Sequence, residues 1–260
     1  MWKPFLATAV AFPLLLSCSG EPIQPSDLSD ETSLTQSPEN RAIVAGHAFI
    51  FPRFDPDNFV RQVDNRFFPL TPGTRWVYKG EEDGEAEVNI TIVTHDRKNI
   101  LGVSAVVVLD RVFAGGELKE KTFDWYAQDT QGNVWYLGEN TKEFENGRVV
   151  STEGSWEAGK LGARPGIIML AHPKVGDRYR QEFLAGEAED QARVVAVDID
   201  QEPVPYGRFN NCLRTVEFTR LEPGVREAKI YCPRVGFVRA RGVEGPAARL
   251  VLTGITHSAR

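Results

Sequence analysis

The sequence predicts a mainly β protein: a single domain built on an antiparallel meander, shaped as a twisted sheet, a sandwich, or an open or closed barrel. Turn-forming residues are frequent, with 23 Gly and 16 Pro among 260 residues. Few stretches have the apolar spacing of an amphipathic helix, and several alternate apolar with polar residues. Aromatic residues make up 10% of the chain and Met occurs twice, a composition that suits strands better than helices.

Residues 1–17 resemble the signal peptide of a bacterial lipoprotein. Lys3 supplies a short basic region, and the apolar run that follows is too short to span a bilayer and ends just before Cys18. In such signals the Cys is lipidated and becomes the mature N-terminus. We therefore expect Cys18 to anchor the chain by acyl chains on the outer side of a membrane. An ordinary signal peptide and an unmodified Cys18 are the alternatives.

Residues 18–48 are expected to form a disordered tether. They are rich in Ser, Pro, Asp, Glu and Gln, and they cannot bury enough apolar area to offset the cost of ordering the backbone. Aromatic density rises at Phe49, so the β-rich domain is expected to span 49–260. The expected location is extracytoplasmic: the periplasm or outer membrane if the cell is Gram-negative, in which case Ser19 favours the outer membrane, and otherwise the cell surface. A net charge of −6 without a basic stripe argues against a nucleic-acid partner.

The first half of the domain is expected to form strands joined by short turns. Asp83-Gly84 and Gly115-Gly116 are turn pairs, and Asn146-Gly147 is a type I′ hairpin signal. The Val-rich run at 102–112 is apolar on both faces, which predicts that both are covered. The expected strands are 74–79, 85–94, 102–112, 118–128, 133–138, 143–145 and 148–150.

The stretch 154–173 interrupts this pattern. It contains four Gly and two Pro, and we expect a long ordered loop there. The strands expected after it are 178–184, 192–200, 212–219, 226–232, 237–243 and 249–255.

Cys212 and Cys232 are expected to form a disulfide. A hairpin that turns at 221–224 sets the two residues opposite each other, and disulfides persist outside the cytoplasm. A register slip of one residue would leave two separate thiols. Their face of the hairpin is expected to point inward, since it also carries Val216, Phe218, Ala228 and Ile230.

The hairpin at 122–138 contains two Trp and two Tyr residues. Its turn at 129–132 predicts a three-residue loop with Gly132 in the left-handed region. This register sets Tyr126 opposite Tyr136 and Ala127 opposite Trp135. Side chains alternate across a strand, so one face, expected to be core, carries Phe123, Trp125, Trp135 and Leu137. The other face mixes rings with polar groups, as ligand-lining surfaces do, and carries Asp124, Tyr126, Gln128, Val134 and Tyr136.

We expect this second face to bind a small or extended ligand, such as a glycan or a lipid-like molecule. The expected binding residues are Asp124, Tyr126, Gln128, Tyr136, Trp156, Arg180 and Glu182. Three alternatives stay open. The rings could complete a second core layer, the aromatic face could meet another protein, or the carboxylates could serve a hydrolase or lyase; the last uses Asp124, Glu139 and Glu182.

Recognised catalytic and cofactor motifs are absent from the sequence. The four His residues lack metal-ligand spacing, and there is no nucleophile elbow, phosphate loop or dinucleotide fingerprint. Whether the protein is an enzyme is therefore left open, and no cofactor is favoured. Calcium is the one candidate, because carboxylate oxygens bind it; its ligands would be Glu187, Glu189 and Asp190. A solvated acidic turn is the alternative.

Several strings resemble those of a group of functionally uncharacterised secreted bacterial proteins and lipoproteins. They are FPLTPGTRW at 68–76, DWYAQD at 124–129, GNVWY at 132–136, GSWEAG at 154–159 and LEPGV at 221–225. The resemblance covers roughly residues 55–242. It implies a secreted protein with a twisted antiparallel sheet and transfers no catalytic residue. Cys232 departs from the group's pattern, in which Ala is more common at this position.

Overall fold

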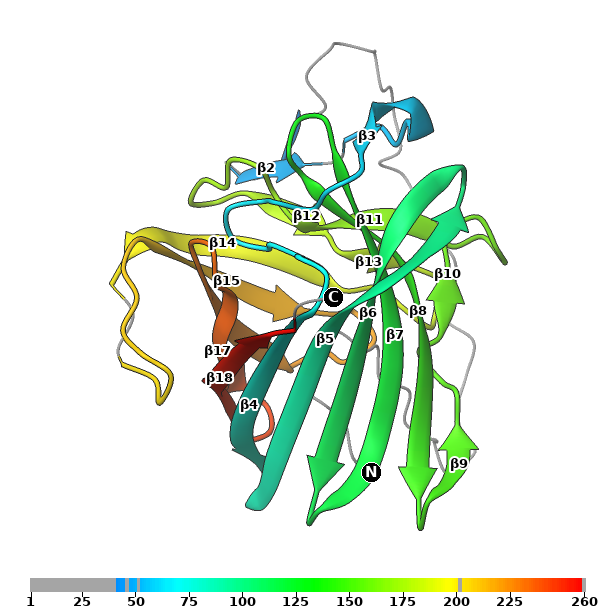
Figure 1. Ribbon diagram of the computed structural model, residues 1–260. Helices are drawn as coiled ribbons and strands as arrows, with labels where there is room; N and C mark the ends of the chain where they lie inside the picture. Colours follow the sequence, from blue (N-terminus) through cyan, green and yellow to red (C-terminus); the bar gives the residue numbers. More distant parts are fainter. Residues whose placement is uncertain (1–40, 45–46, 51, 201–202, 259–260) are drawn as a thin grey trace, which may run out of the picture.

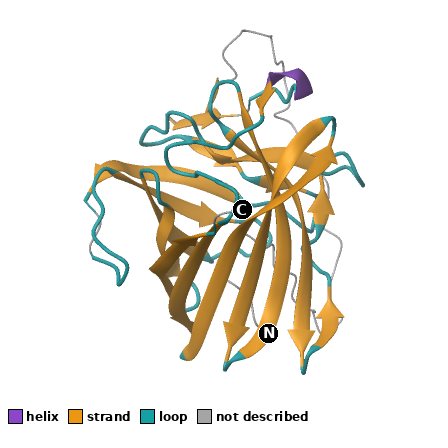
Figure 2. Ribbon diagram, viewed as in Figure 1, coloured by secondary structure: helices purple, strands orange, loops and turns teal. Residues whose placement is uncertain are grey.

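The computed structural model describes residues 41–44, 47–50, 52–200 and 203–258 of the chain. Apart from the short 3₁₀ helix η1 (Pro56–Asn58), these residues form strands and loops (Figure 2). The strands pair into one large mixed sheet that is not closed. The predicted mainly β class and antiparallel meander are confirmed. Cys18 and most of the expected tether lie outside the described residues.

The first half is a meander of long strands that lie side by side in Figure 1. Asn146 and Gly147 both have positive φ, 50° and 73°, which is the predicted type I′ turn. Asp83 and Gly84 form the same kind of turn, with φ of 47° and 84°. The strands are β4 (Thr74–Glu82), β5 (Glu85–Ile100), β6 (Val103–Ala114), β7 (Glu117–Asp129), β8 (Val134–Glu145) and β9 (Arg148–Ser151).

The long loop expected at 154–173 is wrong in part. It contains β10 (Trp156–Glu157) and β11 (Arg164–Met169), and both pair with β8. The apolar residues Ile167, Ile168 and Met169 are buried, and β8 offers unpaired backbone groups on that side. Burial and edge pairing outweigh the Gly and Pro content that predicted a loop.

The strands of the second half bring the chain back beside the first strand of the meander. β12 (Arg178–Arg180) pairs with β14 (Gln191–Ile199), and β13 (Glu182–Phe183) pairs with β11. An antiparallel series follows: β15 (Cys212–Phe218), β16 (Arg226–Cys232), β17 (Gly236–Glu244) and β18 (Ala248–His257). β18 then pairs with β4 along its length, which places the C-terminal strand beside the first strand of the meander (Figure 1).

Three short strands precede the meander. β1 (Arg41–Val44) and β2 (His47–Ile50) form a hairpin that begins before the expected domain boundary at residue 49. β2 also pairs in parallel with β12, through Phe49 and Ile50. β3 (Phe59–Val60) pairs with the end of β7. The segment between β3 and β4 then runs from the β7 end of the meander to β4, as the cyan trace in Figure 1 shows.

The sheet curls so that the inner face of β4–β7 looks toward β16 and β17. Side chains from both groups line one interior cavity: Trp76 from β4, Asp110 from β6 and Asp124 from β7 face Lys229 from β16 and Phe237 from β17. This arrangement positions the candidate site, because it turns one face of each long strand away from solvent.

The disulfide between Cys212 and Cys232 is present, with a Cα–Cα distance of 4.3 Å. Both cysteines and their neighbours Ala228 and Ile230 are buried, as expected, but the cavity lies on the other face of the hairpin. Lys229 and Tyr231 line the cavity, and Cys232 lies on the opposite face of β16. Both faces of this hairpin contain buried residues, so alternation alone does not identify the inner one.

Reduction of this disulfide is expected to lower the free energy of unfolding by about 3 kcal/mol, because the bond closes a loop between residues 20 apart and restricts the unfolded chain. Thermal unfolding with and without reductant measures the effect. Cys212→Ala/Cys232→Ala is the control: its midpoint should be low and insensitive to reductant. Equal midpoints for the oxidised and reduced protein would contradict a stabilising bridge.

Candidate functional site

The aromatic hairpin of β7 and β8 has the register expected from its turn. The Asp129 N–H donates to the Asn133 carbonyl at 2.9 Å, which leaves a three-residue loop. Gly132 has a φ of 95°, the left-handed conformation predicted for it. The opposed pairs are Tyr126–Tyr136 and Ala127–Trp135, as predicted.

A β-bulge follows in β8, at Leu137, and the sequence pattern does not predict it. Gly138 has a φ of 135°, and a Cβ there would clash with the Trp156 carbonyl. The extra residue changes the alternation of side chains. Glu139 therefore points to the same side as Tyr136, whereas strict alternation would separate them.

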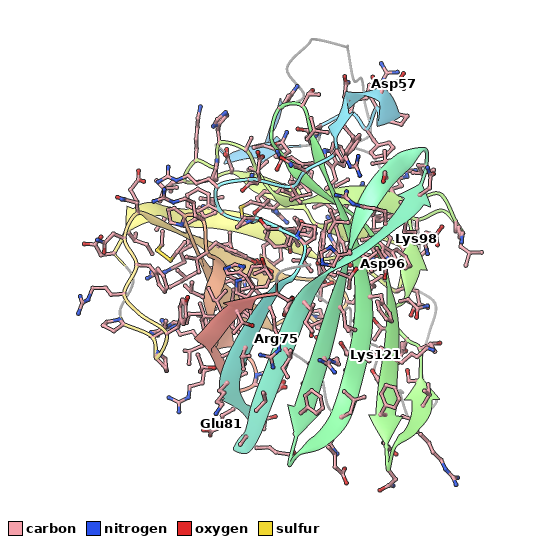
Figure 3. The ribbon with its side chains drawn as sticks, in the orientation of Figure 1. Asp57, Arg75, Glu81, Asp96, Lys98 and Lys121 are labelled. Atoms are coloured by element: carbon pink, nitrogen blue, oxygen red, sulfur yellow. A yellow bond between two sulfur atoms is a disulfide. The ribbon has the colours of Figure 1, made fainter. Side chains whose placement is uncertain are left out.

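Three of the four residues expected to be core, Trp125, Trp135 and Leu137, are buried, but on β7 this face is turned away from the cavity. Phe123 is half-buried there, with the Lys121 ammonium 4.9 Å from its ring centroid. Trp125 is buried beneath Lys98, whose ammonium lies 3.4 Å from the ring centroid; Figure 3 labels both lysines. The expected ligand-lining face is the inner one, where Asp124 and Tyr126 line the cavity.

The interior cavity has a volume of about 70 Å³, which is room for about five water molecules. The segment Phe68-Pro69-Leu70 and the β16–β17 turn at Val235-Gly236 form one end of it. These two segments are fixed to each other, since the Arg234 N–H donates to the Arg66 carbonyl at 2.7 Å.

Five aromatic rings of the cavity lining form a continuous arc that includes residues from both groups of strands. Each ring contacts the next, with centroid separations of 5.2 Å, 6.4 Å, 5.8 Å and 5.0 Å. These distances are those of edge-on and tilted aromatic pairs. In order, the rings belong to Tyr126, Phe68, Tyr231, Phe237 and Tyr78.

Three buried acids from β6 and β7 line the cavity together with this arc: Asp110, Glu120 and Asp124. Asp110 accepts hydrogen bonds from Asn89 (2.7 Å) and Thr91 (2.8 Å). Burial nevertheless raises the pKa of Asp110 to about 6. Burial, and then the charge of Asp110, raise the pKa of Asp124 to about 7.

Glu120 differs from the other two acids in its hydrogen bonding. Its Oε1 accepts from the Thr122 hydroxyl at 2.8 Å, and its Oε2 has no protein partner within the described residues. Burial raises the pKa of Glu120 well above its ordinary value, and the nearby charges of Asp110 and Asp124 raise it further. The charge of Asp110 therefore favours the neutral forms of Asp124 and Glu120, and the charge of Asp124 favours the neutral form of Glu120.

A hydrogen-bonded network extends from this wall into the sheet. The Tyr136 hydroxyl lies 2.6 Å from Asp124 Oδ1 and 2.9 Å from Glu139 Oε2. A hydroxyl carries one proton, so one of the two carboxyls must supply the other. Glu139 is suited to be protonated, because burial and the charge of Glu182 raise its pKa well above the ordinary range. Trp156 joins the network by donating to Glu182 at 2.9 Å.

One cation, Lys229, also lines the cavity, and its charge is already balanced. Its ammonium lies 2.8 Å from Glu217 Oε2 and 3.3 Å from Glu227 Oε2. Glu217 also accepts from the Tyr231 hydroxyl at 3.0 Å. This pairing raises the pKa of Lys229 despite its burial.

The structure brings together five of the seven predicted binding residues: Asp124, Tyr126, Tyr136, Trp156 and Glu182. Gln128 instead holds the segment before β4, because its Oε1 accepts hydrogen bonds from the backbone N–H groups of Asp64 and Asn65. Arg180 lies elsewhere, 4.6 Å from the ring centroid of Phe183. The sequence reasoning missed Asp110, Glu120 and Lys229 as lining residues, although each is a charged residue inside a strand.

The side chains of Glu187, Glu189 and Asp190, the residues expected to bind calcium, do not form a group that could hold a metal ion. Glu189 accepts from the Gly186 N–H at 3.0 Å within the turn. Within the part of the chain that the structure describes, no three His, Cys, Asp or Glu side chains are grouped to hold a metal ion. The calcium site stays a prediction. In the same residues, no helix is long and apolar enough to cross a membrane.

A second, wider depression of about 720 Å³ lies at the tip of the hairpin. Its polar lining groups are largely engaged in the local fold. Asp129 accepts from the Trp135 indole at 2.9 Å and from the Asn133 backbone at 2.9 Å, and Asp177 accepts from the Lys174 N–H at 2.8 Å. The interior cavity is therefore the better candidate site.

Comparison with known proteins finds similarity to solved structures at low sequence identity. No protein-family model matches the chain, and no curated protein does. The chain is similar to a Bacteroides fragilis structure described as an exported protein with a YmcC-like fold, at 15% identity and a TM-score of 0.45, covering 74% of this chain and 99% of that one. It is also similar to a structure described as a lipoprotein from Parabacteroides distasonis, at 14% identity and a TM-score of 0.42, covering 75% and 100%. These similarities transfer no function.

Proposed function

We propose that the chain is an extracytoplasmic lipoprotein whose curled sheet binds a small ligand in the interior cavity. The observation that carries the proposal is the cavity itself, with an aromatic arc and three buried acids in its lining. The exposed lining of the cavity is mostly apolar and includes a few polar groups, which is how small-ligand sites are generally built. Anchoring through Cys18 rests on the lipoprotein-like signal at the N-terminus.

The size of the cavity limits the size of the ligand that it can hold. A volume of about 70 Å³ suits a molecule of a few non-hydrogen atoms rather than a glycan chain. An extended ligand could place only one end group in a cavity of this size. We therefore favour a small ligand over the extended one.

The competing functions find less support in the geometry. Asp124 and Glu139 do share the Tyr136 hydroxyl, as an acid/base pair could. Glu139 is 2% exposed and Glu182 is 0% exposed, and neither lines the cavity, so a substrate there would reach only Asp124 of the three. A protein-interaction role for the aromatic face is disfavoured as well, because its rings point inward.

A thermal-shift screen with small amines, alcohols, polyols and carboxylic acids tests the proposal. A ligand that binds only the folded protein, at about 100 times its Kd, adds about 2.7 kcal/mol to stability. Val108→Phe fills part of the cavity and should abolish the shift. Val149→Phe enlarges an exposed strand residue and should preserve it. A screen without any shift, or a shift that survives Val108→Phe in the folded variant, would argue against the cavity.

A further inference from the structure

We infer that the ligand of the interior cavity is a small organic cation, of the amine or quaternary ammonium class. This inference rests on the proposed function and adds the charge and chemical class of the ligand. Three features of the lining support it: the aromatic arc, the unbalanced acids, and the lack of a metal-binding arrangement.

The aromatic arc supplies the first argument. A cation is attracted to the face of an aromatic ring by the ring quadrupole, and aromatic cages are the usual means of recognising quaternary ammonium groups. Five rings in contact with one another line the cavity. An anion would meet the same rings and the acids unfavourably.

The acids supply the second argument. Asp110, Glu120 and Asp124 are 4%, 4% and 8% exposed, so water screens them little. Lys229 is the cation of the protein that also lines this cavity, and it is already paired with Glu217 and Glu227. The free Oε2 of Glu120 leaves an acceptor position for an N–H donor. A bound cation would balance the carboxylates that the protein itself leaves unbalanced.

The arrangement of oxygens argues against a metal ion as that cation. Ca²⁺ needs six to eight oxygen ligands at short range, and no three carboxylates or imidazoles among the described residues are grouped to hold a metal. An organic cation spreads its charge over several atoms and needs aromatic faces and nearby carboxylates rather than direct coordination. The lining of the cavity has both the aromatic rings and the carboxylates that an organic cation needs.

The pH dependence of binding follows from the same acids. Asp110 and Asp124, with pKa values raised to about 6 and about 7, are mainly neutral at pH 5 and mainly ionised at pH 8. A cation gains from the ionised form, so its binding should release protons at pH 6–7. We expect at least tenfold tighter binding at pH 8 than at pH 5.

The experiment compares tetramethylammonium with tert-butanol, a neutral molecule of similar size and shape. Isothermal titration and thermal shift are run on the folded protein at both pH values, with NaCl at equal ionic strength as a control. Tetramethylammonium should bind and tert-butanol should not. Asp124→Asn and Glu120→Gln preserve side-chain size and should each weaken binding at least tenfold, whereas Glu85→Gln changes an exposed acid of β5 and should not.

Each outcome decides a separate point. If tert-butanol binds as tightly as tetramethylammonium, or if another neutral compound binds in the cavity and cations do not, the charge inference is overturned while the proposed function stands. If neither probe and no compound of the screen binds, both are overturned. Binding that Glu85→Gln weakens as much as Asp124→Asn would show a diffuse surface effect and overturn the inference.

Discussion

Replacing Lys229 with Met is expected to lower the free energy of unfolding by about 3–5 kcal/mol, the usual cost of removing one partner of a buried ion pair. Lys229 is 3% exposed and holds Glu217 and Glu227 at 2.8 Å and 3.3 Å. Without the ammonium, two carboxylates face each other in the interior with no cation. They must either ionise unpaired or take up protons, and both are unfavourable at neutral pH.

Urea or thermal unfolding at pH 8 measures this effect. Lys79→Met removes an exposed lysine from β4 and serves as the matched control, with an expected change within about 0.5 kcal/mol. Adding Glu217→Gln and Glu227→Gln to Lys229→Met should recover part of the loss, because the unpaired charges are then gone. If Lys229→Met cost no more than Lys79→Met, the ion cluster would not stabilise the fold.

The stability of the protein is expected to fall as the pH rises from about 4 to about 8. Glu87 is 1% exposed, and neither of its carboxylate oxygens has a hydrogen-bond partner. Burial, and then the charges of Glu82, Asp110 and Glu227, raise its pKa from 4.5 to about 8. The folded protein therefore holds this proton over a pH range in which the unfolded chain has released it. Stability decreases with pH wherever the folded state binds more protons.

The loss of stability between pH 4 and pH 8 can be large, since each tenfold change in proton affinity corresponds to about 1.4 kcal/mol. For Glu87 alone the loss between the two pKa values is on the order of 5 kcal/mol, and Asp110, Asp124 and Glu227 act in the same direction. Glu87→Gln should flatten the pH profile and raise stability at pH 8. Glu85→Gln, an exposed control on the same strand, should leave the profile unchanged. A wild-type profile that is flat or rises from pH 5 to pH 8 would refute the prediction.

Features fixed by local chemistry could be predicted from the sequence. Asn146-Gly147 favours positive φ at both residues, and Gly132 permits the left-handed residue of a three-residue loop, so the hairpins have the expected registers. The turn at 221–224 likewise places Cys212 opposite Cys232. In each case a few neighbouring residues determine the geometry, without contributions from distant parts of the chain.

Features that depend on distant parts of the chain could not be predicted. The inner face of a curled sheet is chosen by how β4–β8 meets β16–β17, and both faces of these strands contain apolar residues. On β7 the inner face is the more polar one, with Glu120, Thr122 and Asp124, so polarity alone would assign it to the solvent side. The bulge at Leu137 depends on contact between Gly138 and the Trp156 backbone, and no residue pattern in β8 indicates it.

The attachment of the segment before β4 has a kinetic consequence. Gln128 accepts hydrogen bonds from the backbone of Asp64 and Asn65 at 2.9 Å and 2.8 Å, and Asn65 donates to the carbonyls of Gly132 and Leu170 at 2.8 Å and 3.2 Å. These bonds hold the segment that continues to Phe68 at the end of the cavity. Under the proposed function, a ligand that left the cavity past Phe68 would have to wait for this segment to detach. Its residence time would then depend on Gln128 and Asn65, neither of which lines the cavity.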